Sequence, residues 1–89
     1  MIQVATTPHF KRSRNKYIKN SVKKAKQFLS ALNAFRHNPS HPSLNVEKLI
    51  NSDIWSMRIN RSDWIFFAWI NNETALLLEI GHHDMYRKV

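Results

Sequence analysis

The sequence predicts an α+β fold in which an N-terminal helical hairpin packs on a twisted antiparallel sheet. Residues 22–35 carry apolar side chains at the period of about 3.6 residues that is typical of a helix. Residues 54–80 instead contain three short apolar runs separated by two polar turns, which favours an antiparallel meander. A chain of 89 residues is long enough for one small core, so we expect a single domain over residues 1–89.

The N-terminal elements are indicated by their end signals. Gln3–Ala5, which follows Ile2, is expected to form a short edge strand. Thr7 and Pro8 indicate a helix start, with Thr7 as N-cap and Pro8 at the first helical position. Asn20 and Ser21 predict a break and a second cap.

The second helix is expected to end at Asn38, because the residue before Pro39 disfavours the helical region. Its apolar stripe should face the sheet and consists of Val22, Ala25, Phe28, Leu29, Leu32 and Phe35.

Three strands should follow, at 54–60, 64–70 and 75–80, joined by polar turns. Alternation places Ser56 and Arg58 on one face of the first strand. The residues expected to pack against the long helix are Trp55, Met57, Ile59, Leu76, Leu78 and Ile80.

The charge is unevenly distributed along the chain. The net charge is +8, and all six acids follow Val46. Residues 1–46 therefore carry nine Lys or Arg and no carboxylate. An N-terminal half without acidic residues favours binding to an external polyanion. Nucleic acid is preferred over an acidic protein or an anionic membrane surface.

Other features narrow the class. The chain has no cysteine, which excludes a disulfide framework and a thiolate metal site. No apolar run approaches the roughly 20 residues that span a bilayer, and the N-terminus does not resemble a secretory signal. We therefore expect a soluble, cytoplasmic protein. His82, His83 and Asp84 lack the spacing of a helical zinc site, so we expect neither a metal nor another cofactor.

Five segments follow the basic helical hairpin in order, and they are His41–Leu44, Glu47–Leu49, Ile54–Ile59, Ile65–Phe67 and Ile80–Arg87. As an ordered set with that hairpin, they resemble the RelE/ParE superfamily of bacterial toxins, the toxic partners in two-component toxin–antitoxin modules. The resemblance implies a RelE-like fold and an acidic antitoxin partner. It also implies either ribosome-dependent mRNA cleavage, as in the RelE-like branch, or gyrase inhibition, as in the ParE branch. The histidine- and tyrosine-containing ending favours the RNA-cutting branch.

Metal-independent RNA cleavage needs a base, an acid and a cation beside the phosphate. His82 and His83 are acid–base candidates, and because neighbours in a strand point in opposite directions, we expect only one, with His83 preferred, to reach the substrate. The resemblance further implies roles for Tyr86, which would orient the 2′-OH or stack on a base, and for Glu47, as general base. Arg58 matches the family's basic residue in its strand and is expected to grip phosphate.

Further residues are expected to contact RNA. Arg87 and Lys88 follow the proposed catalytic residues, and Arg61 precedes the central strand. Basic residues of the helical hairpin should grip ribosomal RNA, and they are Lys11, Arg12, Arg14, Lys23, Lys24 and Lys26.

One position departs from the family. Many relatives carry arginine at the start of the central strand, where this chain has Trp64. An indole has no positive charge, although it can stack on a base. Either Arg61 or Arg58 substitutes for the missing cation, or the chain cleaves weakly. Two non-catalytic alternatives therefore stay open, namely a ParE-like gyrase inhibitor and a degenerate toxin that retains only antitoxin binding.

Overall fold

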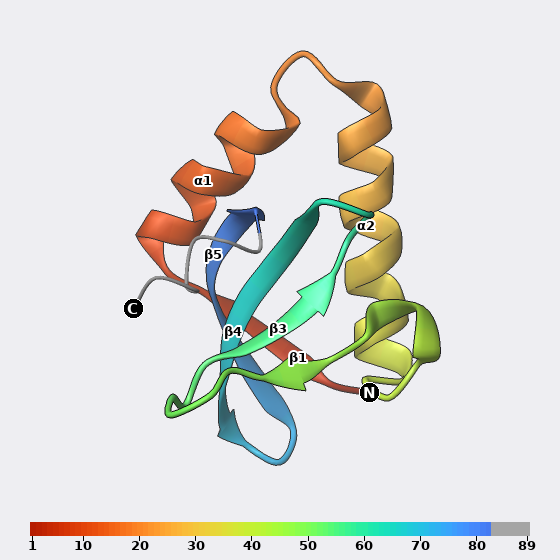
Figure 1. Ribbon diagram of the computed structural model, residues 1–89. Helices are drawn as coiled ribbons and strands as arrows, with labels where there is room; N and C mark the ends of the chain where they lie inside the picture. The colour runs from red at the N-terminus through yellow and green to blue at the C-terminus, as the bar shows by residue number, and fades with distance from the viewer. Residues whose placement is uncertain (83–89) are drawn as a thin grey trace.

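The computed structural model describes residues 1–82. Two α-helices are combined with a five-stranded sheet, which confirms the α+β class (Figure 1). None of the helices in this part of the chain is long and apolar enough to cross a membrane. In chain order the elements are β1 (Gln3–Thr6), α1 (Pro8–Ile18), α2 (Val22–His37), the 3₁₀ helix η1 (Pro42–Leu44), β2 (Glu47–Lys48), β3 (Trp55–Arg58), β4 (Asp63–Asn71) and β5 (Thr74–His82).

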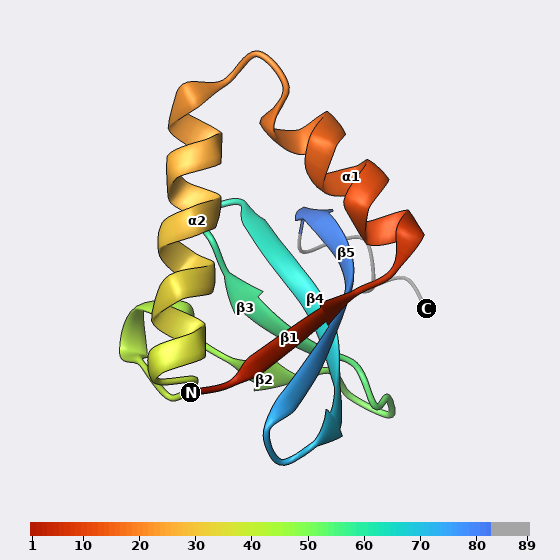
Figure 2. The same ribbon diagram turned by 180° about the vertical axis from the view of Figure 1, so that it is seen from behind.

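The strand order in the sheet is β1-β5-β4-β3-β2. The neighbouring pairs from β5 to β2 are antiparallel, whereas β1 runs parallel to β5. The expected N-terminal edge strand is therefore confirmed. β1 pairs only with the first half of β5, at Thr74–Leu77, and α1 lies beside the rest of β5 (Figure 2). The helix thus covers a strand edge that β1 leaves free, which limits edge-to-edge association.

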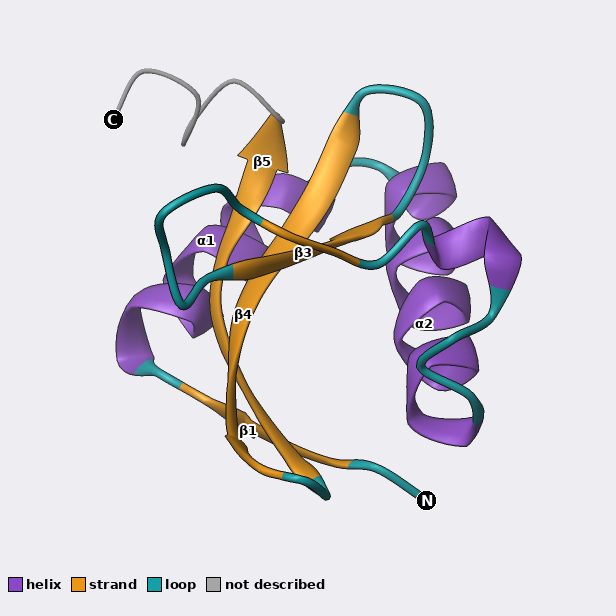
Figure 3. Cartoon of the chain, turned by 60° about the horizontal axis from the view of Figure 1, so that its bottom comes forward, coloured by secondary structure: helices purple, strands orange, loops and turns teal. Residues whose placement is uncertain are grey.

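The helix ends follow the local signals. The Thr7 hydroxyl accepts a hydrogen bond from the Phe10 N–H at 3.0 Å, and the Ser21 hydroxyl accepts one from the Lys24 N–H at 3.1 Å. Asn20, between the helices, has a left-handed backbone with φ 61°, and Asn38 is extended after α2. The predicted caps, break and end are all confirmed. The helices diverge from this connection, α1 toward the β5 side of the sheet and α2 toward the β3 side (Figure 3).

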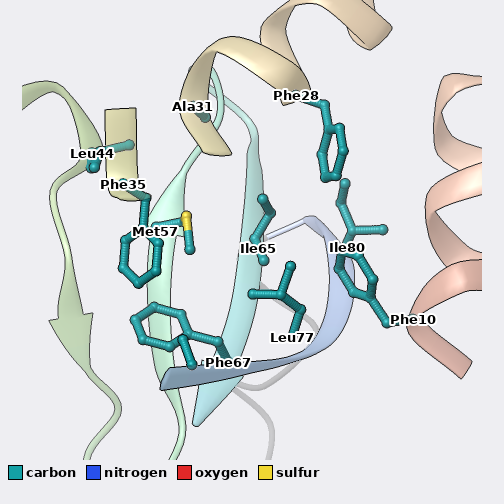
Figure 4. Packing of buried hydrophobic residues seen from close by; sticks show 11 residues of the cluster. Phe10, Phe28, Ala31, Phe35, Leu44, Met57, Ile65, Phe67, Leu77 and Ile80 are labelled. Atoms are coloured by element: carbon teal, nitrogen blue, oxygen red, sulfur yellow. The ribbon is translucent and has the colours of Figure 1, made fainter. Parts of the chain in front are cut away.

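The core lies between the helices and one face of the sheet (Figure 4). Phe35 packs edge-on against Phe67 of β4, with ring centroids 5.0 Å apart. Phe10 contributes from α1 and Leu44 from η1, and both are almost fully buried. Burying one such side chain stabilises a fold by about 1.5–3 kcal/mol, so a few residues from each element suffice to hold the layers together.

The prediction of which apolar side chains of α2 face the sheet is partly wrong. Val22 and Leu29 are 72% and 62% exposed, whereas Ala31 is buried beside Phe28 and Phe35. The periodicity correctly predicts a helix, but apolar residues cover more of its circumference than the sheet can contact. Tertiary packing therefore selects a strip rotated toward Ala31.

The prediction of which side chains of β5 face the core is also partly wrong. Leu77 and Ala75, rather than Leu76 and Leu78, join Ile80 in the core. The register shifts where Phe66 pairs with Glu79 and Phe67 pairs with Leu77, which leaves Leu78 as the extra residue. A β-bulge of this kind reverses the alternation beyond it, so strict two-residue periodicity fails along this strand.

Candidate nucleic-acid interface

The sheet has a second face, turned away from the helices. Residues directly opposite each other in neighbouring strands share a face. Glu47 pairs with Ser56, which pairs with Phe66, while Arg58 pairs with Trp64. These five side chains therefore lie on the face opposite to that of the core residues Met57, Ile65 and Phe67. We call this group the outer-face cluster.

The side chains at the base of the outer-face cluster are buried. Ser56 and Phe66 are both almost fully buried, although Phe66 does not belong to the core between helices and sheet. Trp64 is half-buried, and Arg58 and Glu47 are exposed. The face thus presents a cation and a carboxylate to solvent above a packed, largely apolar base.

Arg58 is supported by Trp64. Its guanidinium carbon lies 5.5 Å from the centroid of the indole ring, within the range of a cation–π contact. An exposed contact of this type is worth about 0.5–1 kcal/mol, enough to favour one orientation of a flexible side chain. Trp64 brings no charge of its own to this position. It instead holds the cation of the adjacent strand on the outer face.

Glu47 lies at the β2 edge of the same face. It is opposite Ser56, two residues before Arg58, and so stands diagonally to Arg58. Diagonal neighbours in an antiparallel pair are typically about 7–8 Å apart at the backbone. Two long, exposed side chains at that spacing can hold a carboxylate and a guanidinium on either side of a phosphodiester group.

His82 is not part of this cluster. It pairs with Asp63 across β4 and β5, whereas the next pair, Trp64 and Gly81, faces the opposite way. The Nδ1 atom of His82 lies 3.3 Å from Asp63 Oδ1 and 3.2 Å from the Ser62 carbonyl oxygen. The structure therefore does not bring His82 together with Arg58, and the preferred candidate, His83, lies outside the described residues.

Asp63 anchors a polar cluster that sequence reasoning missed. Its Oδ2 atom accepts hydrogen bonds from the Tyr17 hydroxyl at 2.6 Å and from the Asn60 side-chain amide at 3.1 Å. The same amide donates to Gln27 at 3.0 Å. Burial of the hydroxyl, together with its hydrogen bond to Asp63 and the nearby charge, raises the pKa of Tyr17 above its usual value.

This cluster, which we call the Tyr17–Asp63 cluster, ties α1 and α2 to the turn between β3 and β4. That turn separates Arg58 from Trp64, so the cluster supports the geometry of the outer face. The sequence does identify residues 60–63 as a turn. Nothing along the chain indicates that Tyr17, 46 residues away from Asp63, completes it.

The predicted RNA-binding bases lie on several surfaces. Arg61 is exposed on the β3–β4 turn. Arg14 is partly buried and donates to Asn15, and the Lys24 ammonium lies 5.0 Å from the centre of the Tyr17 ring. The remaining helical bases are exposed and comprise Lys11, Arg12, Lys23 and Lys26. Within residues 1–82 the salt bridges join His9 to Glu79 and His82 to Asp63, so lysine and arginine are not neutralised by acids there.

Four predicted site residues, His83, Tyr86, Arg87 and Lys88, lie outside the described residues. Their roles stay predictions. Among residues 1–82, no three His, Asp or Glu side chains gather as a potential metal site.

Comparison with solved structures agrees with this geometry. The chain superimposes on a YoeB/ParE toxin from Agrobacterium tumefaciens with a TM-score of 0.75 and 10% identity, over 92% of this chain and 99% of that one. A metal-bound toxin from Helicobacter pylori superimposes with a TM-score of 0.75 and 17% identity, over 97% of this chain and 99% of that one. A chain of the YoeB–YefM complex from Staphylococcus aureus superimposes with a TM-score of 0.72 and 16% identity, over 93% of this chain and 98% of that one.

The sequence matches no protein-family model, and no curated protein matches it. The structural similarities cover nearly the whole chain and establish that its fold is the one expected from the resemblance.

Proposed function

Starting from the RelE/ParE-type toxin fold that this chain has, we propose that it is the single-domain toxin of a toxin–antitoxin module and cleaves mRNA on the ribosome. The observation that carries the proposal is the placement of Arg58 on the Trp64 ring, diagonal to Glu47 on an otherwise closed sheet face. The carboxylate-free basic half provides additional support, because ribosomal RNA is a polyanion.

The proposed reaction is an internal phosphoryl transfer. The 2′-oxygen attacks the adjacent phosphorus, a 2′,3′-cyclic phosphate forms, and the bond from phosphorus to the 5′-oxygen breaks. Glu47 accepts the 2′-OH proton, and Arg58 stabilises the negative charge that grows on the phosphate oxygens. His83 donates a proton to the departing 5′-oxygen and Tyr86 orients the 2′-OH, roles that rest on the sequence resemblance alone.

The surfaces around the outer-face cluster would bind the remainder of the ribosomal complex. Trp64 offers the exposed part of its ring to a base, and Arg61, Arg87 and Lys88 contact the message backbone. The helical bases Lys11, Arg12, Arg14, Lys23, Lys24 and Lys26 contact ribosomal RNA. Such a function places the protein in the cytoplasm, where its targets are.

An acidic antitoxin is the proposed protein partner. One of the structurally similar chains was solved in the YoeB–YefM complex, and the positive surface of this chain suits a negatively charged segment. A partly disordered acidic segment can wrap such a surface and fold as it binds.

The decisive experiment incubates the protein with translating ribosomes and a defined message, and maps cleavage by primer extension. Arg58→Ala is expected to reduce the cleavage rate by about 100- to 1,000-fold, the usual cost of removing one group that stabilises transition-state charge. Lys48→Ala is the matched control, because Lys48 is exposed on β2 but pairs with Trp55 of the core face. No cleavage by the wild type, or equal cleavage by wild type and Arg58→Ala, rejects the nuclease function.

A second candidate is a non-catalytic toxin, such as a ParE-like gyrase inhibitor. The observation in its favour is Trp64, which leaves the central strand without the cation that relatives have there. A DNA supercoiling assay with purified gyrase separates the two functions. Inhibition by both wild type and Arg58→Ala, without ribosomal cleavage, would support the second candidate.

A further inference from the structure

A groove of about 380 Å³ runs between α2, η1 and the end of β3. Its apolar wall is formed by Ala31 and Ala34 of α2, Leu44 of η1 and Ile59 after β3. A volume of a few hundred Å³ is at the scale of sites that hold one small ligand. The groove lies outside the outer-face cluster, but Arg58 belongs to both.

The groove carries positive charge. Lys26 of α2 and Arg58 of β3 line it, and no carboxylate from the described residues 1–82 does. Neither cation forms a salt bridge within residues 1–82. The exposed hydroxyl groups of Ser30 and Ser43 add neutral hydrogen-bonding groups to the lining. Two separated cations beside an apolar wall suit a ligand with a flat apolar part and flanking negative charges.

We propose that this groove is a subsite for one unpaired nucleotide of single-stranded RNA. Its base lies against the apolar wall, and its flanking phosphates contact Lys26 and Arg58. This inference rests on the proposed function, since the same strand would continue to the outer face. An RNA occupant is favoured over an acidic peptide because Arg58, which lines the groove, is also the residue that contacts the reacting phosphate of the message in the proposed function.

The shared arginine gives the strand a defined path. From Trp64 and Arg58 on the outer face it passes the end of β3 and reaches α2 at Lys26. Proteins that bind single strands combine a basic groove with stacking surfaces in this way. The subsite would then help to hold the message still while the adjacent phosphodiester reacts.

The test measures binding of a fluorescein-labelled eight-nucleotide RNA without ribosomes, by fluorescence anisotropy across a range of salt concentrations. Lys26→Ala should weaken binding at least fivefold and reduce the slope of log K against log salt by about 0.7, the value for one phosphate contact on a single strand. Lys19→Ala removes an equal charge from the exposed connection between the helices and is the matched control. Ala34→Phe, which fills the groove without changing charge, should weaken binding without changing the slope.

Equal effects of Lys19→Ala and Lys26→Ala would show general charge attraction and overturn the subsite. Unchanged affinity in Lys26→Ala would overturn it as well, whether or not Ala34→Phe folds. A third outcome would assign the groove to a protein partner instead. In that outcome a glutamate-rich peptide displaces the RNA, and Ala34→Phe abolishes binding of the peptide but not binding of the RNA. Because wild-type cleavage on the ribosome is measured separately, failure of the subsite is distinguishable from failure of the nuclease function.

Discussion

At the residue scale, the site depends on how one side chain supports another. An arginine on a solvent-exposed strand samples many rotamers, and fixing it costs conformational entropy. The Trp64 ring reduces this freedom, because the guanidinium carbon of Arg58 lies 5.5 Å from its centre. Trp64 therefore brings no charge of its own but helps to order the cation of Arg58. This is why we assign to Arg58 the role of stabilising the phosphate.

A second pair, His9 and Glu79, joins α1 to β5. The His9 Nε2 atom lies 2.5 Å from a Glu79 carboxylate oxygen. Burial of this carboxyl works to raise its pKa, but hydrogen bonds from Ser13, His9 and the Ile80 backbone N–H outweigh burial and lower the pKa of Glu79 below 4.5. The folded state therefore favours the ionised carboxylate.

This lowered pKa predicts a contribution to stability that depends on pH. Because the folded pKa is below the unfolded one, the contribution is fully present at pH values well above the unfolded pKa and is lost as the pH falls through the folded pKa. Glu79→Gln should cost about 1.5–3 kcal/mol of unfolding free energy at pH 7, the range of a hydrogen bond to a charged group. The difference from wild type should shrink toward pH 3, as measured by urea denaturation.

Glu73→Gln, which changes an exposed carboxylate in the β4–β5 turn, serves as the control and should behave as wild type at each pH. A Glu79→Gln deficit that stays the same from pH 7 to pH 3 would contradict the assigned role of the carboxylate.

At the scale of elements, the Tyr17–Asp63 cluster is the connection that positions the β3–β4 turn. It uses one side chain from each helix and two from the turn, all joined by hydrogen bonds. Every buried side-chain nitrogen and oxygen in residues 1–82 has a partner. Removing the Tyr17 hydroxyl takes away one of the two hydrogen bonds at Asp63 Oδ2 and leaves the one from Asn60, so a buried carboxylate loses part of the compensation for its burial.

Tyr17→Phe should therefore destabilise the fold by about 1–3 kcal/mol, because Asp63 loses its shortest hydrogen bond. Denaturation at pH 7 is suitable, since the raised pKa keeps the Tyr17 hydroxyl protonated there. A double-mutant cycle with Asp63→Asn isolates the interaction. Additive effects of the two substitutions would show that Tyr17 acts only through packing.

At the scale of the whole molecule, the dominant feature is the net charge of +8, which arises from the half that contains both helices. The helices diverge over the sheet (Figure 1), so we expect the exposed basic residues that they carry to be spread over a broad surface. Such a distribution suits a large polyanion better than a small anionic ligand, because many phosphates can be contacted at once.

This charge predicts that association with ribosomes is steered electrostatically. The association rate should fall steeply between 50 and about 200 mM salt, since screening shortens to about 8 Å at physiological ionic strength. Replacing Lys11 and Arg12 by glutamine should reduce that dependence, and stopped-flow light scattering measures it. The double replacement Gln3→Ala and Asn15→Ala, which changes exposed residues without changing charge, is the control. A rate that does not respond to salt would contradict steering.

The elements of this protein were determined by residues that are neighbours in the chain. Thr7 and Ser21 cap helices through a backbone N–H three residues ahead, and Asn38 ends α2 because Pro39 follows it. These interactions form between residues a few positions apart, so the sequence alone predicted where both helices begin, where α2 ends, the approximate positions of β1, β3, β4 and β5, and the α+β class, but not the short strand β2. The resemblance further predicted a toxin fold, which similar solved structures confirmed.

The choice of faces and partners was decided only by the tertiary structure. Leu78 forms a bulge because β5 must pair with β4, and no local pattern shows that extra residue. His82 turns to Asp63, and Asp63 to Tyr17, across distances in the chain that local periodicity does not span. The groove beside Arg58 likewise requires α2, η1 and β3 to meet. The physical reason is that backbone propensity and capping depend on adjacent residues, whereas packing and cross-strand pairing depend on residues that only folding brings together.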